Sequence, residues 1–93
     1  MENETLKLLS LLDKAANEMI SKGDQPSFSY FDTCEDVGLF IQSITNKAIN
    51  DELEEISKLW YIFVPTSVWD DSGGSLEIAN EIFEIINREY QPE

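Results

Sequence analysis

The 93-residue chain contains 19 acidic and six basic residues and no histidine, which gives a formal net charge of −13. This balance argues against nucleic-acid binding, because a groove that follows phosphates needs clustered lysine and arginine, and here the bases are scattered singly among acids. The length suits one domain with one core, and a hydrophobic content of 42% argues against disorder. We therefore expect a single folded domain over residues 1–93.

Cys34 is the only cysteine. One thiol without any imidazole supplies neither an internal disulfide nor a Cys/His zinc site. The apolar stretch 6–12 is interrupted by polar residues, and Glu2 and Glu4 stand where a secretory signal would carry positive charge. We expect a cytoplasmic protein with no signal peptide, no membrane span, no metal and no cofactor.

The first predicted helix covers residues 2–22, and Gly23 just beyond it is a typical helix end. Its apolar residues recur mostly at spacings of three and four, as in an amphipathic helix: Leu6, Leu9, Leu12, Ala16, Met19 and Ile20. Residues 24–32 follow as an aromatic-rich, ordered connector; a short edge strand is the less favoured alternative. Its three aromatic side chains are expected to pack onto the core: Phe28, Tyr30 and Phe31.

Thr33 opens the second predicted helix, because its hydroxyl can cap the backbone and Asp36 three residues later approximates a capping box. The inward face consists of five residues: Val37, Phe40, Ile41, Ile44 and Ala48. A third helix is predicted from Asn50 or Asp51 to Phe63 or Val64. Its apolar spacing is three, four and three: Leu53, Ile56, Trp60 and Phe63. Pro65 ends it, because the residue before a proline avoids the helical region.

The run Leu59–Val64 is apolar throughout and rich in residues that favour strands. Periodicity does not separate a buried strand from a buried helix end over six residues. The spacing carried through from Leu53 favours the helix. A helix that is apolar on every side must either cross the middle of the bundle or leave part of its surface for a partner.

Residues 65–74 are predicted to form an acidic loop, after which Ser75 begins a fourth helix, with Ser72 or Ser75 as its cap. The predicted inward face of this helix again has the helical period: Ile78, Ala79, Ile82, Phe83 and Ile86. The fold class is therefore all-α, a compact bundle of about four helices.

The chain lacks the usual inventory of an enzyme. Without histidine, neither a Ser/His nor a Cys/His pair exists, and Cys34 is interpreted as an inert packing residue. Asp70 and Asp71 offer oxygen ligands for Mg²⁺ or Ca²⁺, but their spacing does not match a calcium loop and turn chemistry explains them better. A divalent-metal-dependent enzyme using these two aspartates is the least favoured alternative.

Seven acids in the C-terminal half have no obvious cationic neighbour: Asp51, Glu52, Glu55, Asp70, Asp71, Glu77 and Glu81. Because helices three and four are joined by the acidic loop, we expect these carboxylates to share one surface. Three aromatic residues are expected nearby: Trp60, Tyr61 and Trp69. These ten residues form the predicted partner-binding site.

The leading hypothesis is a non-catalytic module that binds a basic protein, as an immunity or antitoxin-like inhibitor does. Focused charge speeds encounter with a positive target, and buried aromatics hold the complex. Acidity that only keeps the protein soluble is the simplest competing interpretation. A further alternative is a homo-oligomeric structural or assembly subunit that associates through Leu59–Val64.

Overall fold

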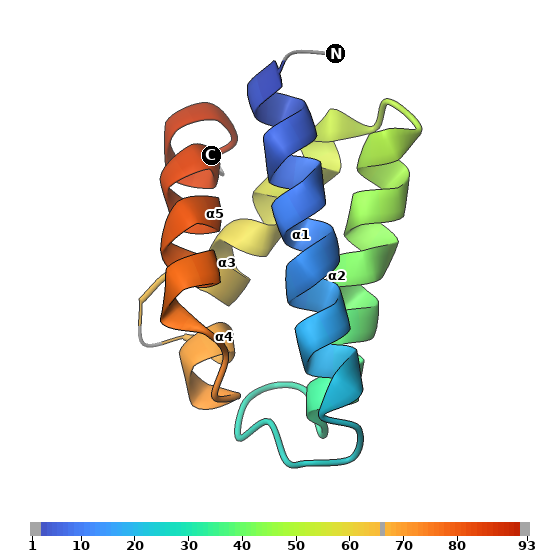
Figure 1. Ribbon diagram of the computed structural model, residues 1–93, viewed down its shortest axis with the longest axis vertical. Coiled ribbons are helices and arrows are strands. Elements are labelled where there is room, and N and C mark those ends of the chain that lie inside the picture. Colours follow the sequence, from blue (N-terminus) through green and yellow to red (C-terminus); the bar gives the residue numbers. More distant parts are fainter. Residues whose placement is uncertain (1–2, 66, 92–93) are drawn as a thin grey trace.

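Two long helices, α1 (Asn3–Ser21) and α2 (Cys34–Ile49), form the frame of the fold and run antiparallel side by side (Figure 1). The computed structural model describes residues 3–65 and 67–91. The buried stripe of α1 contains Leu8, Leu12, Ala16 and Met19, close to the predicted spacing. The predicted all-α fold is confirmed.

Gly38 permits the close approach of these two helices. A Cβ atom at this position would lie 2.7 Å from the Ala16 carbonyl oxygen and 2.8 Å from the Ile20 backbone nitrogen. Both atoms belong to the backbone of α1, so they have little freedom to move aside. The glycine therefore sets the distance between the axes of α1 and α2.

The predicted boundaries between α1 and α2 are confirmed. Gly23 has a φ of +63°, and its N–H donates to the Ile20 carbonyl at 3.0 Å, which closes the last turn of α1. Thr33 is extended, and its hydroxyl accepts from the Asp36 N–H at 3.2 Å. Side-chain capping therefore fixes the start of α2.

The third predicted helix consists of two shorter pieces, the 3₁₀ helix η1 (Leu53–Leu59) and α3 (Trp60–Phe63). Apolar residues three apart stand above one another in a 3₁₀ helix, so Ile56 and Leu59 form one buried row of η1, and Ile62 of α3 is buried after them. The helical interpretation of Leu59–Val64 is confirmed as far as Phe63; Val64 is extended before Pro65. The pair η1–α3 crosses the space between α2 and the C-terminal helix (Figure 1).

The predicted loop 65–74 contains a one-turn helix, α4 (Val68–Asp71), so the prediction of an irregular loop is wrong there. Val68 and Trp69 are buried, and the burial of this apolar pair stabilises the packing of the segment onto the core. The last helix, α5 (Leu76–Glu89), returns beside α1.

Contacts with α1 and α4 hold the start of α5. Ser75 occupies the N-cap position, but its side chain makes no capping hydrogen bond. Its N–H donates to Glu18 Oε2 at 2.8 Å, and its carbonyl accepts from Trp69 Nε1 at 2.9 Å. The start of α5 is therefore held by a long-range carboxylate and an indole N–H, and the predicted serine side-chain cap is not formed. Gly74 lies against the indole ring, where a Cβ would overlap it.

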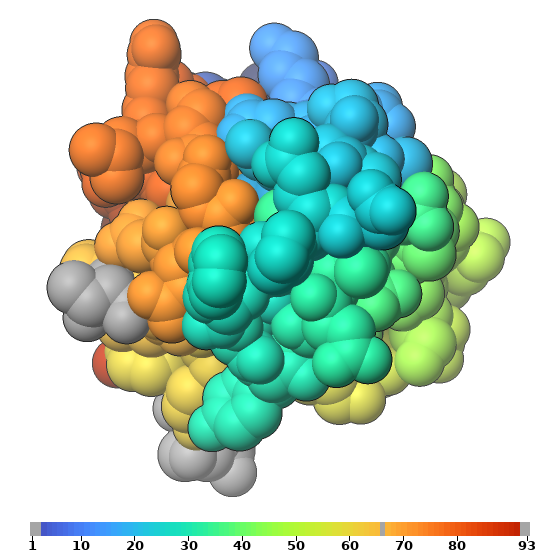
Figure 2. Space-filling view, turned by 90° about the horizontal axis from the view of Figure 1, so that it is seen from below, coloured from blue at the N-terminus to red at the C-terminus, as the bar shows by residue number. Residues whose placement is uncertain are grey.

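The connector between α1 and α2 lies across one end of the molecule (teal in Figure 2). Phe31 packs on Phe40, with ring centroids 5.6 Å apart. Phe28 and Tyr30, in contrast, are 80% and 96% exposed. The prediction that all three aromatic side chains pack onto the core is therefore wrong for these two.

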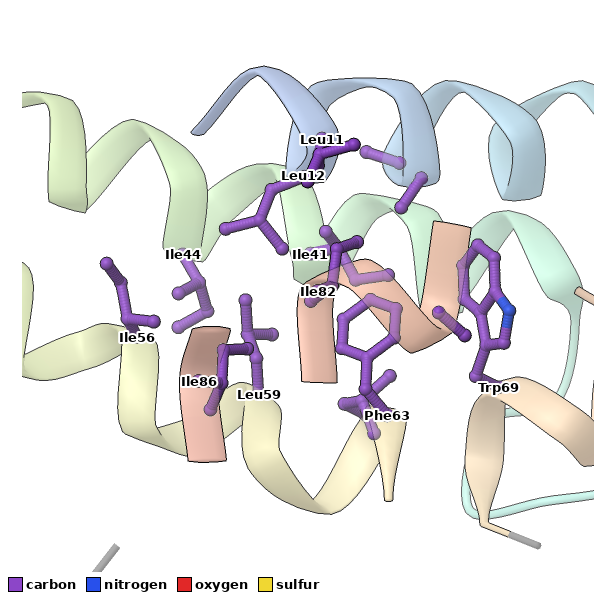
Figure 3. Close-up of a cluster of buried hydrophobic side chains, with 14 of the residues drawn as sticks. Leu11, Leu12, Ile41, Ile44, Ile56, Leu59, Phe63, Trp69, Ile82 and Ile86 are labelled. Carbon is purple, nitrogen blue, oxygen red and sulfur yellow. The ribbon is translucent and has the colours of Figure 1, made fainter. Parts of the chain in front are cut away.

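The core fills the space between all the helices (Figure 3). Ile41 and Ile44 of α2 face Leu59 and Phe63, and Ile82 of α5 closes the cluster. Trp69 lies at one side of the cluster, with its ring centroid 5.1 Å from that of Phe63. Across the described residues, no helix is long and apolar enough to cross a bilayer.

Candidate partner-binding surface

The structure does not bring the seven predicted acidic residues onto one surface. Asp51 and Glu52 lie in the turn between α2 and η1, at the end of the molecule where α1 begins. Asp70 and Asp71 lie in α4, at the opposite end (Figure 1). The seven acids are thus distributed over both ends and α5.

Glu55 has two cationic neighbours, so the prediction that it lacks one is wrong. Its carboxylate lies 3.2 Å from Lys47 Nζ and 2.7 Å from Lys58 Nζ. Lys47 is contributed by α2, eight residues earlier, a partner that helical spacing alone does not reveal. Glu55 therefore ties η1 to α2.

The two tryptophans hold structural positions. Trp69 is fully buried, and the expectation of an indole at the surface is wrong for it. Trp60 is half-buried between Tyr61 and Phe83, and its Nε1 donates to Asn87 Oδ1 at 3.2 Å. Only Tyr61, at 58% exposure, is largely open to solvent among these three predicted aromatics.

Glu77 and Glu81 are exposed on α5. Glu81 lines a groove of about 360 Å³ between α1 and α5. Arg88 lies in the same groove and is paired with Glu4 and, at 3.8 Å, with Glu84. Lys7 also lines the groove, so its acidic residues are partly neutralised by two cations.

The strongest candidate surface is the segment between α1 and α2, called here the aromatic loop (residues 24–33). The sequence predicted that the aromatic side chains of this segment would pack onto the core. Its exposed rings, Phe28 and Tyr30, stand on a backbone that is firmly held. Ser27 is fully buried, and its hydroxyl accepts from the Ser29 N–H at 3.2 Å and donates to the Phe31 carbonyl. The alternation of serine and aromatic residues in this segment was the available signal, because small polar residues can turn inward to satisfy the backbone.

Further hydrogen bonds attach the aromatic loop to its neighbours. The Cys34 N–H donates to the Gln25 carbonyl at 2.8 Å, and Pro26 and Thr33 form an isolated antiparallel bridge. The hydroxyl of Ser72, which follows α4, donates to the Ser27 carbonyl at 3.3 Å. The loop and α4 therefore form one continuous end of the molecule.

Phe28 adopts a φ of +59°, in the left-handed region. For a residue other than glycine, this conformation costs roughly 1–2 kcal/mol, and an exposed ring recovers little of it through packing. Strained backbone of this kind persists where the surroundings enforce it and is concentrated at functional sites. Strain and exposure thus coincide at one residue.

An open groove of about 490 Å³ separates the aromatic loop from α4. The residues that line it come from both segments: Phe28, Ser29, Tyr30, Ser67, Val68 and Asp71. Figure 2 shows the two segments, teal and orange, side by side at this end. Four further exposed acids belong to the loop and to the first turn of α2: Asp24, Asp32, Glu35 and Asp36.

Comparisons with family models, curated proteins and solved structures found no match to this chain. Within the described residues, no group of three or more acidic or cysteine side chains is placed to hold a metal ion.

Proposed function

We propose that this protein is a non-catalytic acidic module that binds a basic protein through the aromatic loop and α4. The observation that carries the proposal is the exposure of Phe28 and Tyr30 on a loop held by hydrogen bonds of the buried Ser27. Exposed apolar groups gathered at one place are typical of interaction sites, and tyrosine is enriched among the residues that dominate binding energy.

The charge of the chain indicates the character of the partner. A net charge of −13 repels acidic proteins and nucleic acids and attracts a basic surface from a distance. Asp71 lines the groove beside the exposed rings, and the exposed Asp32 belongs to the same loop as these rings, so both add negative charge to this end of the molecule. An immunity or antitoxin-like inhibitor that covers a basic protein surface is the specific form of the proposal.

The preformed loop supports tight binding. Ordering a flexible loop on association consumes part of the interaction free energy. Here the backbone is already fixed at Ser27 and Cys34, so the rings are presented without that cost. The strain at Phe28 is likewise present before the partner arrives.

Affinity capture from an extract of the source cells tests the proposal with three versions of the chain. The test variant is the double change Phe28→Asn and Tyr30→Ala; asparagine tolerates the left-handed conformation, so the fold is expected to survive. The control is Ile49→Ala, which removes an apolar side chain of 57% exposure at the opposite end. We expect a basic protein to be retained by the wild type and the control and lost with the test variant.

The association rate of the captured protein gives the second measurement. Electrostatic steering predicts a fall of roughly tenfold or more between 50 and 500 mM salt. Retention of the same proteins by all three versions, or an association rate that salt does not change, would contradict the proposal.

Self-association through Leu59–Val64 is a second candidate, favoured by one observation. Leu59, Ile62 and Phe63 are buried, but Tyr61 is exposed with its ring edge-on to Trp60, 5.1 Å between centroids. Sedimentation velocity separates the two candidates. A dimer that Trp60→Ala dissociates favours self-association, whereas a monomer at all concentrations excludes it.

A further inference from the structure

The groove between the aromatic loop and α4 has features that match one kind of side chain. Its volume, about 490 Å³, lies in the range of roughly 300–1,000 Å³ typical of sites for small ligands, and is therefore large enough for a long side chain. Two of its lining residues are aromatic, Phe28 and Tyr30, and among the described residues that line it only Asp71 carries a charge. A cation with a flat, partly apolar surface fits this combination.

The hydroxyls of the two lining serines, Ser29 and Ser67, already form hydrogen bonds within the walls of the groove. Ser29 Oγ lies 2.7 Å from Ser27 Oγ and accepts from the Phe31 N–H at 3.3 Å. Ser67 Oγ donates to the Tyr61 carbonyl. These bonds fix the shape of the groove, and they leave the Asp71 carboxylate as the charged group that a ligand meets.

We propose that the groove receives an arginine side chain from an exposed segment of the basic partner, an inference that rests on the proposed function. A guanidinium group is planar, stacks on aromatic faces and donates two parallel hydrogen bonds to a carboxylate. The rings of the aromatic loop provide the stacking surface, and Asp71 provides the carboxylate. A lysine ammonium is a compact, strongly hydrated charge. It can pair with the carboxylate, but its interaction with the aromatic rings is weaker than that of a guanidinium group.

NMR titration with blocked tripeptides tests this assignment directly. The probes are acetyl-Gly-Arg-Gly-amide and the same peptide with citrulline, which keeps the shape and removes the charge, or with lysine. We expect the arginine peptide to shift the amide signals of residues 28–30 and 67–71 in a saturable way. The citrulline peptide should produce no saturable shift, and the lysine peptide should bind at least threefold more weakly.

Matched variants locate the interaction. Asp71→Asn is expected to weaken the arginine peptide at least fivefold, whereas Glu77→Gln, which neutralises an exposed acid outside the groove, should leave its affinity unchanged. The amide spectrum of each variant shows whether the fold is retained. Equal weakening by both variants, or shifts spread evenly over all acidic segments, would overturn the assignment.

The two proposals fail separately. If capture depends on Phe28 and Tyr30 but the arginine peptide does not saturate the groove, only the arginine inference is wrong. If the peptide binds at Asp71 but the loop variant captures the same proteins as the wild type, the proposed function is wrong.

Discussion

Glu55 is the residue at which electrostatics have their clearest local effect. Hydrogen bonds from Lys58 and then from Lys47 lower the pKa of its carboxyl group below the ordinary value of 4.5. Because Lys47 belongs to α2 and Glu55 to η1, the ionised form joins two elements across the turn at Asn50–Glu52.

The lowered pKa of Glu55 makes a small part of the stability depend on pH. A pKa that is lower in the folded than in the unfolded state stabilises the fold above the ordinary value, and this contribution disappears as the pH falls through the lowered pKa. The side chains of Lys47 and Lys58 are 48% and 55% exposed, so solvent screening keeps the effect small. We expect the double variant Lys47→Met and Lys58→Met to raise the pKa of Glu55, measured by carboxyl ¹³C NMR titration; an unchanged pKa would contradict the pairing.

Residues with a positive φ differ in whether this backbone conformation could be predicted from the sequence. Gly23 was predictable, since glycine is the usual residue at a helix end. Asp51 and Phe28 adopt φ values of +72° and +59° without such a signal. In both cases the surrounding chain imposes the conformation, through the turn after α2 at Asp51 and through the hydrogen bonds of Ser27 and its neighbours at Phe28. For this reason the left-handed backbone of Phe28 could not be predicted from the sequence, although the alternation of serine and aromatic residues was a signal for the exposure of its ring.

At the scale of elements, the helices with a clear apolar period were predictable and the short ones were not. The spacing of α1, α2 and α5 matches one buried stripe each. The segment η1 instead repeats at every third residue, which sequence analysis assigned to an ordinary α-helix. The apolar pair Val68 and Trp69 is too short to show a helical period. The helix α4 was therefore not predictable from the sequence, because it forms through packing that only the tertiary structure shows.

The contact of α1 with α2 leads to a prediction about Gly38. Gly38→Ala should destabilise the protein by about 1–3 kcal/mol, as overpacking does, because the new methyl group meets the backbone at Ala16 and Ile20. Asn46→Ala, at an exposed position of the same helix, is the control and should be neutral or slightly stabilising. Urea unfolding followed by circular dichroism measures both, and equal stabilities would show that the helices can separate without cost.

At the scale of the whole molecule, the excess of negative charge could be read from composition, but its distribution could not. Which acids share a surface depends on how the helices pack, and packing puts Asp51 and Asp71 at opposite ends. The same packing brings α4 against the aromatic loop, two segments about 40 residues apart in the chain. The candidate groove therefore arises only from the tertiary fold.

The net charge of −13 should oppose the compact state through self-repulsion. Raising sodium chloride from 20 to 500 mM screens that repulsion, and we expect Tm to rise by about 5 °C, which corresponds to roughly 1 kcal/mol for a domain of this size. Potassium chloride should have the same effect, since screening depends on ionic strength. A Tm that is constant or falls with salt would show that local ion pairs outweigh the general repulsion.

Cys34 is buried with its Sγ 3.6 Å from the Ser72 carbonyl and 3.7 Å from that of Pro26, at the junction of the aromatic loop, α2 and the segment after α4. A thiol reagent reaches it only when this junction opens, so the rate of labelling measures how often the junction separates. As the chain has no second cysteine, the signal is unambiguous. The labelling rate of Cys34 thus reports how often the end that we propose for binding opens. Any ligand that closes the groove should lower this rate.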